Sequence, residues 1–337
     1  MASSVRSALA NFSNTHCVTL SVRACDTNCS RKNVHRKLRE CLLRGQQCRS
    51  VHSSKQTVQS TSAYCAELVR KYDYENFLAT LLYPKTYRSA AFAIRSLNVE
   101  IAQVRDVITD KNIGVMRMQF WKEAIDSIYQ GTPRQTPVCI EMAKAVEDHK
   151  LSKQWITRLI ESRTENLSDA PFRNKEHMEA YCENTVSSVL YLLLQAAGVK
   201  SIHADHAASH IGKAHGIVTL LRATPFNANR ERVYLPTDVL LQHCVSQQSF
   251  VRGLKDQPVR DVVFDIASIA NRHLETARSF KTDVPREALP VFYNTVMCDR
   301  YLKMIQAVDF DVFHPSLQQR NHLLPLHLWM RKLKRTY

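Results

Sequence analysis

From residue 61 onward, apolar residues recur three or four positions apart along almost the whole chain. This spacing places them on one face of a helix, and no convincing run shows the strict alternation of a half-buried strand. We therefore predict an all-α domain. The expected helices cover residues 61–82, 85–106, 115–130, 137–149, 152–165, 175–197, 204–223, 258–280 and 287–308, and a last helix follows Pro315.

The first 55 residues differ in composition from the rest of the chain. They hold ten Lys and Arg residues against Asp26 and Glu40, which is +8 of the formal net charge of +15, and they are rich in Ser. This composition is typical of a mitochondrial transit peptide, although a disordered basic arm would share it. We interpret residues 1–55 as a transit peptide and residues 56–337 as a single helical domain. Because the leader carries the main excess of charge, we expect no binding to nucleic acid.

Half of the ten cysteines lie in this leader. The other five, which are widely scattered, are Cys65, Cys139, Cys182, Cys244 and Cys298. They form neither a disulfide framework nor a metal-binding pair, which fits a reducing compartment such as the mitochondrial matrix. The longest apolar stretch, residues 189–199, is too short to span a bilayer, so we expect any membrane association to be peripheral.

Several short motifs follow one another along the domain. They are residues 74–84, residues 90–106, an Arg-x-x-x-Trp-x-Glu motif at residues 117–123, Gly-Thr-Pro at residues 131–133, Leu-Ile-Glu-Ser-Arg at residues 159–163, and residues 219–236 with the ending Val-Tyr-Leu-Pro. In this order they resemble motifs of the squalene/phytoene synthase family over roughly residues 61–310. The resemblance implies an isoprenoid-synthase-like helical bundle around a central cavity.

The residues that would bind metal in that family are missing here. The family's second Asp-rich motif carries an Asn and two Asp residues at four-residue spacing, and these positions are Thr219, Ala223 and Asn227 in this chain. The first Asp-rich motif is also absent, and only Glu100 and Asp106 remain as acids in residues 90–106. Magnesium prefers carboxylate oxygens, whereas a methyl group supplies no ligand. We therefore predict a pseudoenzyme without metal or cofactor.

Within the family, the pattern Leu-Asn-x-Glu-Ile-Ala-x-Val-Arg at residues 97–105 resembles a mitochondrial subgroup that assists the assembly of respiratory complex I, the NADH dehydrogenase. The resemblance implies a non-catalytic assembly factor on the matrix side of the inner membrane. Its expected partners are complex I assembly intermediates or a nascent membrane-arm subunit, the membrane surface, and a lipid or isoprenoid ligand. The alternative is a magnesium-dependent prenyl diphosphate transferase with a divergent active site that uses Glu100 and Asp106.

The expected helix at residues 204–223 has one face made only of small residues. Periodicity alone favours close contact with a neighbouring helix there, whereas the resemblance favours the wall of a substrate cavity. The candidate residues for a cavity or an anion-binding site are Asn98, Glu100, Gly212, Gly216, Arg222, Arg230, Arg232 and Tyr234. Guanidinium groups suit phosphate, although pairing with Glu231 and other acids is the simpler interpretation of the three arginines.

Five polar residues near the start of this helix include two histidines spaced i, i+4. They are His203, Asp205, His206, His210 and His215. Zinc would need a third and a fourth ligand that the sequence does not supply. We therefore interpret these side chains as solvated or hydrogen-bonded surface residues.

The C-terminal residues 323–335 combine apolar bulk, a tryptophan and four cations. A basic amphipathic helix of this kind can lie on an anionic membrane, and a terminal core helix with a charged end has the same pattern. The candidate membrane contacts are Leu328, Trp329, Arg331 and Lys332.

Overall fold

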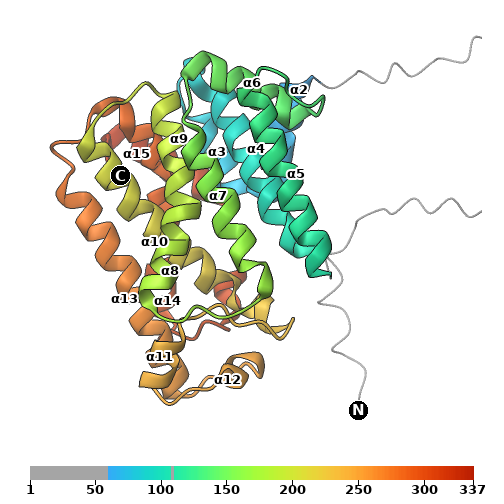
Figure 1. Ribbon diagram of the computed structural model, residues 1–337. Helices are drawn as coiled ribbons and strands as arrows, with labels where there is room; N and C mark the ends of the chain where they lie inside the picture. The colour runs from blue at the N-terminus through green and yellow to red at the C-terminus, as the bar shows by residue number, and fades with distance from the viewer. Residues whose placement is uncertain (1–59, 108–109) are drawn as a thin grey trace, which may run out of the picture. The chain divides into compact units, whose positions relative to one another are not determined.

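The computed structural model describes residues 60–107 and 110–337. They fall in one structural unit, Val58–Tyr337, which is built of helices and short helical turns (Figure 1). The described residues contain no β-strand, so the prediction of an all-α domain is confirmed. None of the helices in these ranges is both long enough and apolar enough to cross a membrane. The predicted transit peptide, residues 1–55, lies outside the described residues.

The helices follow one another with short connections. The first part contains α2 (Thr61–Tyr72), α3 (Tyr74–Leu81), α4 (Lys85–Val107), α5 (Lys111–Tyr129), α6 (Pro137–His149), α7 (Lys153–Glu165) and the 3₁₀ turn η1 (Asn166–Ser168). The middle part contains α8 (Lys175–Cys182), the π-helical turn η2 (Glu183–Ser187), α9 (Ser188–Ala196) and α10 (Ile202–Ala228). The last part contains α11 (Thr237–Gln242), α12 (Gln247–Val251), α13 (Gln257–Ser279), the 3₁₀ turn η3 (Arg286–Asn294), α14 (Thr295–Ala307), the 3₁₀ turn η4 (Pro315–Gln318) and α15 (Leu324–Lys334).

Polar N-cap residues explain where several helices begin. The hydroxyl groups of Ser60, Thr136 and Ser201 each accept a hydrogen bond from the amide three residues later, at 3.2–3.3 Å. Pro137 follows at the first position of α6, where no amide hydrogen is needed. These caps satisfy amide groups that the first turn of a helix leaves unpaired, so they determine the starts of α2, α6 and α10.

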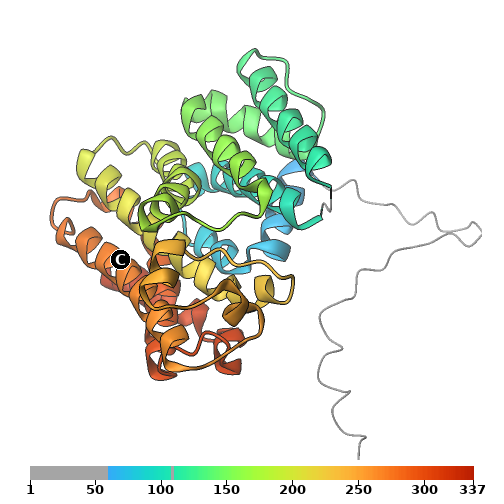
Figure 2. The ribbon, with the colours of Figure 1, turned by 60° about the horizontal axis from the view of Figure 1, so that its bottom comes forward.

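α10 is the helix on which most of the bundle packs. It contacts α8, η2 and α9, and it also contacts α13 and α14 (Figures 1 and 2). Its first half belongs to a buried apolar cluster with α2, α4, α5, α6, α7 and α9. Its second half belongs to another cluster, with residues of α11, α12, α13 and α14. α10 therefore joins the two parts of the core.

Two glycines allow α10 to approach its neighbours closely. A Cβ atom at Gly212 would lie 2.6 Å from the backbone N and Cα atoms of Ser187 in η2. A Cβ atom at Gly216 would lie 2.6 Å from Cβ and Sγ of Cys182 in α8. Protein interiors are close-packed and have no room for a side chain at such distances. At Gly212 and Gly216 the small-residue face is therefore a helix contact, which corrects their prediction as cavity residues.

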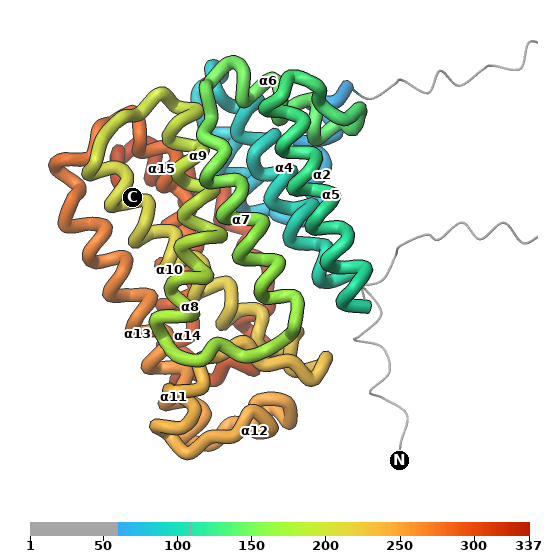
Figure 3. Tube along the Cα trace, viewed as in Figure 1, coloured from blue at the N-terminus to red at the C-terminus, as the bar shows by residue number. Residues whose placement is uncertain are grey.

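The segment from α8 through η2 to α9 runs continuously beside α10, where a single regular helix is predicted over residues 175–197 (Figure 3). Side-chain hydrogen bonds join this segment to α10 in addition to the apolar packing. Ser187 Oγ donates to the Ser209 carbonyl at 3.1 Å, and Ser209 Oγ donates to Glu183 Oε2 at 2.8 Å. Because both bonds join η2 to α10, they help hold the wider π-helical turn in place.

Three features of the helices differ from the prediction. The first expected helix breaks at Asp73, whose backbone φ of −140° is not helical. α10 continues past Pro225 to Ala228, because the amides of Asn229 and Arg230 close its last turn onto the carbonyls of Pro225 and Asn227. α11 and α12, with six and five residues, are too short to show a helical period in the sequence.

We expect Gly212→Ala and Gly216→Ala to destabilise the domain. Each added methyl group meets atoms of the neighbouring helix at 2.6 Å, and overpacking of this kind lowers the free energy of unfolding by about 1–3 kcal/mol. Urea denaturation followed by circular dichroism measures the change. Gly114→Ala in α5 is the matched control, because its Cβ would only touch Leu167 at 3.4 Å, and it should be neutral or stabilise by up to about 1 kcal/mol. Equal midpoints for Gly216→Ala and Gly114→Ala would contradict the tight contact.

Candidate functional site

A cavity of about 480 Å³ lies within the bundle. Its lining residues come from the α2–α3 junction, α4, α7, η2, α9, α10 and the end of η3. Valine, leucine and alanine side chains of α4, η2 and α9 form its apolar part, and charged and amide side chains form its polar part. A pocket with apolar walls and a few convergent polar groups is the usual form of a ligand site, so this cavity is the candidate site.

Two arginines with incomplete hydrogen bonding line the cavity. Arg95 of α4 is only 3% exposed, and its Nη2 donates to Tyr83 Oη at 3.2 Å. Arg163 of α7 donates through Nη2 to Asn98 Oδ1 at 2.7 Å. The buried Nε of each arginine has no partner among the described residues. Unpaired buried donors are costly, so an acceptor group in the cavity would stabilise both guanidinium groups.

His215 of α10 contributes an uncharged ring to the same cavity. Burial, together with the positive charges of Arg95 and Arg222, lowers its pKa to about 3. Asn294 Nδ2 lies 2.9 Å from His215 Nδ1, so the amide donates a hydrogen bond to the unprotonated ring nitrogen. At neutral pH His215 is therefore a hydrogen-bonding group and not a third cation.

Asp73 and Asp106 are the acidic residues of the cavity lining. Burial raises the pKa of Asp73, while the charge of Arg95 and the hydrogen bond from Asn76 oppose that shift. Within residues 60–107 and 110–337, no group of three or more His, Cys, Asp and Glu side chains could hold a metal ion. The charged and amide groups of the cavity therefore suit a polar or anionic group held by hydrogen bonds.

The structure separates the three positions that lack the family's metal-binding residues. Thr219 lines the cavity, but its hydroxyl donates to the His215 carbonyl at 2.8 Å. Ala223 and Asn227 lie one and two turns further along α10, are partly exposed and do not line the cavity. No carboxylate of α10 therefore faces the cavity.

Asn98 and Glu100 lie on different sides of α4. Asn98 and Asp106 line the central cavity, whereas Glu100 lines a second cavity of about 340 Å³ with Arg117 and Trp121 of α5. Burial raises the pKa of Glu100, and the charge of Arg117 opposes this shift. Glu100 and Asp106 are six positions apart, so they project about 120° apart around the helix. The two acids of the alternative enzyme hypothesis therefore do not form one metal site.

Arg222 and Arg230, two of the three arginines near the end of α10, already contact other side chains. Arg222 forms an ion pair with Glu75 of α3 at 2.6 Å. The Arg230 guanidinium lies over the Phe226 ring, 3.8 Å from its centre. Neither residue lines the central cavity. Their prediction as cavity residues is therefore wrong, because a carboxylate and an aromatic ring on the surface hold them instead, whereas their role in anion binding stays a prediction.

Asp169, in the loop after η1, holds Arg232 and Tyr234. It accepts hydrogen bonds from Arg105 Nε at 2.7 Å and Tyr234 Oη at 2.6 Å, and Arg232 Nε lies 3.1 Å away. Burial on its own would raise the pKa of Asp169. The bonds from Tyr234 and Arg105 and the two positive charges outweigh burial and hold this pKa below its usual value. Arg232 and Tyr234 thus fasten the end of α4 to the segment after α10, and neither lines the central cavity.

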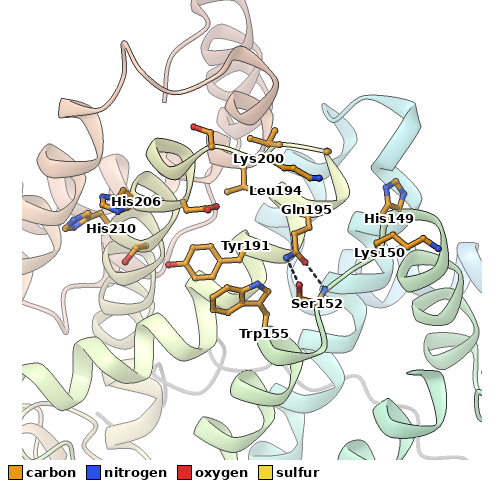
Figure 4. Close-up of a pocket in the computed structure, with 15 residues that line it drawn as sticks. His149, Lys150, Ser152, Trp155, Tyr191, Leu194, Gln195, Lys200, His206 and His210 are labelled. Carbon is orange, nitrogen blue, oxygen red and sulfur yellow. Dashed lines mark hydrogen bonds between the residues drawn. The ribbon is translucent and has the colours of Figure 1, made fainter. Parts of the chain in front are cut away.

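The histidines at the start of α10 border a different pocket, of about 860 Å³ (Figure 4). His206 and His210 line it together with Trp155 and Tyr191, whose ring centres lie 4.5 Å apart. His210 Nδ1 also lies 2.9 Å from His273 Nδ1 on α13. Burial, with the charge of His273 next, lowers the pKa of His210, which favours the neutral form of that ring.

The predicted membrane contacts are divided between two faces of α15. Leu328 is buried in a cluster with residues of α3 and α14, and Arg331 pairs with Asp299 of α14. This corrects the prediction for both residues, because they hold the helix on the domain. Trp329 and Lys332 are exposed and remain available to a partner.

Besides Asn98, four polar residues of the cavity lining were not predicted to lie there. They are Arg95, Arg163, His215 and Asn294. Arg95 carried a signal, because it lies in the apolar stretch of residues 90–97, and arginine is rarely buried unless it is paired. Arg163 ends the motif at residues 159–163, but nothing in that motif indicates that it lines a cavity, and Asn294 carried no signal in the sequence.

We expect Asp169→Asn to lower the free energy of unfolding at pH 7 by about 1–2 kcal/mol, because two cations and a phenol lose a partly exposed charged partner. Since the folded protein depresses this pKa, the carboxylate stabilises the fold above its unfolded pKa of roughly 4, and this contribution disappears as the pH falls through the folded value. Wild type should therefore lose more stability than Asp169→Asn on acidification. Urea denaturation at stepped pH measures this.

Tyr234→Phe is the control for this series, because it removes one hydrogen bond and leaves both ion pairs of Asp169 in place. Its stability at pH 7 should lie between those of wild type and Asp169→Asn. Parallel stability curves for wild type and Asp169→Asn would show that the cluster contributes nothing.

Comparison with known proteins places this fold among isoprenoid synthases. The family model described as squalene/phytoene synthase matches residues 69–327. The crystal structure of a dehydrosqualene synthase in complex with a ligand superposes with a TM-score of 0.71 and 14% identity, over 81% of this chain and 95% of that one. At this identity the likeness concerns the fold alone.

Two relatives are more similar in sequence. The Bos taurus protein named NADH dehydrogenase (ubiquinone) complex I, assembly factor 6, is 53% identical over 277 residues, which are 82% of this chain and 83% of the relative. The Drosophila melanogaster homolog of that factor is 39% identical over 277 residues, 80% of this chain and 83% of its own. With a family match over most of its length and a helical fold to accompany it, this chain belongs to the squalene/phytoene synthase family.

Proposed function

We propose that this chain is a non-catalytic assembly factor for mitochondrial respiratory complex I, which aids the biogenesis of an early membrane-arm subunit by binding protein or lipid. Its 53% identity with the bovine protein named complex I assembly factor 6 supports a role in the assembly of complex I. The chemistry of the central cavity supports binding over turnover, and it is the structural observation on which the proposal depends.

Departure of a prenyl diphosphate requires its negative charges to be neutralised, and magnesium held by carboxylates does this in metal-dependent enzymes. The cavity presents the guanidinium groups of Arg95 and Arg163 beside the two acids Asp73 and Asp106, and α10 offers it no carboxylate. Guanidinium groups can hold an anionic head group by paired hydrogen bonds without a metal ion. The arrangement therefore favours a cavity that retains its ligand.

We place the chain as a peripheral protein on the matrix side of the inner membrane. The Arg- and Ser-rich, acid-poor composition of residues 1–55 supports import into mitochondria. The basic, apolar C-terminal residues 323–335 support contact with a lipid surface. The partners would be complex I assembly intermediates or a nascent membrane-arm subunit, which the chain would bind until that subunit joins the complex.

The purified chain should release no diphosphate from farnesyl or geranylgeranyl diphosphate with magnesium, under conditions in which an active synthase does. Product analysis by mass spectrometry measures this. Ala223→Asp combined with Asn227→Asp should not create activity, since the first Asp-rich motif is absent as well.

In cells that lack their own assembly factor, the wild-type chain should restore complex I on native gels. Turnover that Asp106→Ala abolishes would make the enzyme hypothesis the better account.

The cavity should bind a prenyl phosphate without magnesium. We expect farnesyl phosphate to raise the melting temperature equally with magnesium and with a chelator. Arg163→Gln should weaken this binding about tenfold, because it removes a charged donor from the cavity. Arg158→Gln is the matched control, since Arg158 is on the same helix but lies over the Trp155 ring and not in the cavity. A requirement for magnesium, or equal affinity of both variants, would contradict this mode of binding.

A further inference from the structure

α15 presents large apolar side chains on the face that points away from the domain. The exposed apolar residues in and just before this helix are Leu323, Leu326, Trp329, Met330 and Leu333, each between 39% and 60% exposed. Isolated apolar residues on a surface are ordinary, but a contiguous group usually marks an interaction site. We call Leu326, Trp329, Met330 and Leu333 the α15 stripe.

The α15 stripe follows the helical repeat. Its members are spaced i, i+3, i+4 and i+7, so they occupy an arc about 100° wide. Lys332 borders this arc on the side of Trp329, and Lys334 borders it on the side of Met330. Both lysines are exposed, and neither forms an ion pair within the described residues. The stripe is therefore an apolar face with a cation on each side.

The opposite face of α15 is fixed to the domain. Leu324 and Leu328 are 2% and 1% exposed and pack in a cluster with residues of α3, η3 and α14. Arg331 pairs with Asp299, which also accepts two bonds from Arg278 at 2.7 Å. These contacts determine the rotation of α15 about its own axis, so the α15 stripe faces outward in the folded protein. Exposure of the stripe does not require the C-terminus to unfold.

The charged side chains of the C-terminal segment itself all have one sign. After Asp311 the chain contains no Asp or Glu, and its cations are Arg320, Arg331, Lys332, Lys334 and Arg335. These five supply most of the +7 formal charge that remains beyond the leader, and residues 56–311 carry only +2. An apolar stripe with a tryptophan, bordered by lysines in an acid-free segment, matches an anionic lipid surface in both polarity and charge.

We propose that α15 lies in the headgroup layer of an anionic bilayer, with the α15 stripe at the acyl-chain boundary and Lys332 and Lys334 beside lipid phosphates. This deepens the proposed location at the inner membrane and rests on it. A second copy of the chain is a poorer occupant, because two stripes face to face would bring two sets of cations together with no acid between them.

Trp329 provides a local probe of this contact in the full chain. The chain has three tryptophans, Trp121, Trp155 and Trp329, and the basic leader contains none. Vesicles of phosphatidylcholine with about 30% cardiolipin, carrying brominated acyl chains, quench a tryptophan only where it reaches the acyl boundary. We expect wild type to be quenched and Trp329→Phe to show no quenching of its remaining fluorescence, however strongly the leader attracts the vesicles.

Two double variants test the two components of the surface by vesicle co-sedimentation. Leu326→Ser with Leu333→Ser should reduce vesicle affinity about tenfold by removing apolar burial. Lys332→Gln with Lys334→Gln should reduce it about tenfold at low salt, with the difference shrinking at high salt. Ile113→Ser with Met116→Ser on α5 is the matched control, because these residues are 48% and 71% exposed and lie on another helix. It should bind as wild type does.

Unchanged melting temperatures would show that the variants remain folded. Unquenched Trp329, or equal vesicle affinity of the stripe variant and the α5 control, would overturn the proposal. A stripe variant that turns a dimer into a monomer without changing vesicle affinity would assign the face to a second copy and also overturn it. Loss of complex I rescue by the stripe variant, with vesicle affinity unchanged, would assign the face to a protein partner and overturn it likewise.

The proposed function is judged separately by the wild-type chain. If wild type restores complex I and binds no vesicles, the lipid contact is wrong and the assembly function stands. If wild type binds vesicles through the α15 stripe and fails to restore complex I, the surface is correct and the assembly function is wrong.

Discussion

The close contact of α10 with α8 and η2 is the packing constraint on which the rest of the structure depends. Gly212 and Gly216 have no Cβ atom, and this lets α10 lie against the backbone of Ser187 and the side chain of Cys182. Thr219, one turn further, already lines the cavity. His215, between the two glycines, lines the cavity as well, so one face of α10 packs against its neighbours while another face borders the candidate site.

Within that cavity, arginine side chains are the cationic groups, and α10 supplies no carboxylate that could bind a metal ion. The two kinds of charge differ in what they can do. Magnesium held by carboxylates can stabilise a departing diphosphate, whereas guanidinium groups such as those of Arg95 and Arg163 can hold an anion by hydrogen bonds without a metal ion. The Nε groups of both arginines lack partners among the described residues, so the folded chain contains two buried hydrogen-bond donors without an acceptor. An acceptor group of a bound ligand would satisfy these donors.

The sequence was sufficient for the fold and insufficient for the site, and particular residues explain why. Helical periodicity and N-caps such as Ser201 act within a few positions, so they can be recognised along the chain. Arg222 and Arg232 were recognisable as cations near a motif, but their partners Glu75 and Asp169 are distant in sequence and become neighbours only through packing. Gly212 and Gly216 were correctly seen as small, yet smallness is compatible with either a contact or a cavity wall, and only the position of η2 decides between them.

The effect of a charged residue also depends on its neighbours in the folded chain. A net charge of +7 beyond the leader describes a moderately basic domain, but the arginines that first attract attention are neutralised by carboxylates or stacked on rings. Most of this net charge lies after Asp311, in a segment that contains no Asp or Glu and whose helix exposes Trp329. Apolar and cationic groups reinforce one another at a lipid surface, since burial of the former brings the latter within reach of phosphates. The proposed function uses both features, an interior site for a ligand and a helix face that matches a lipid surface.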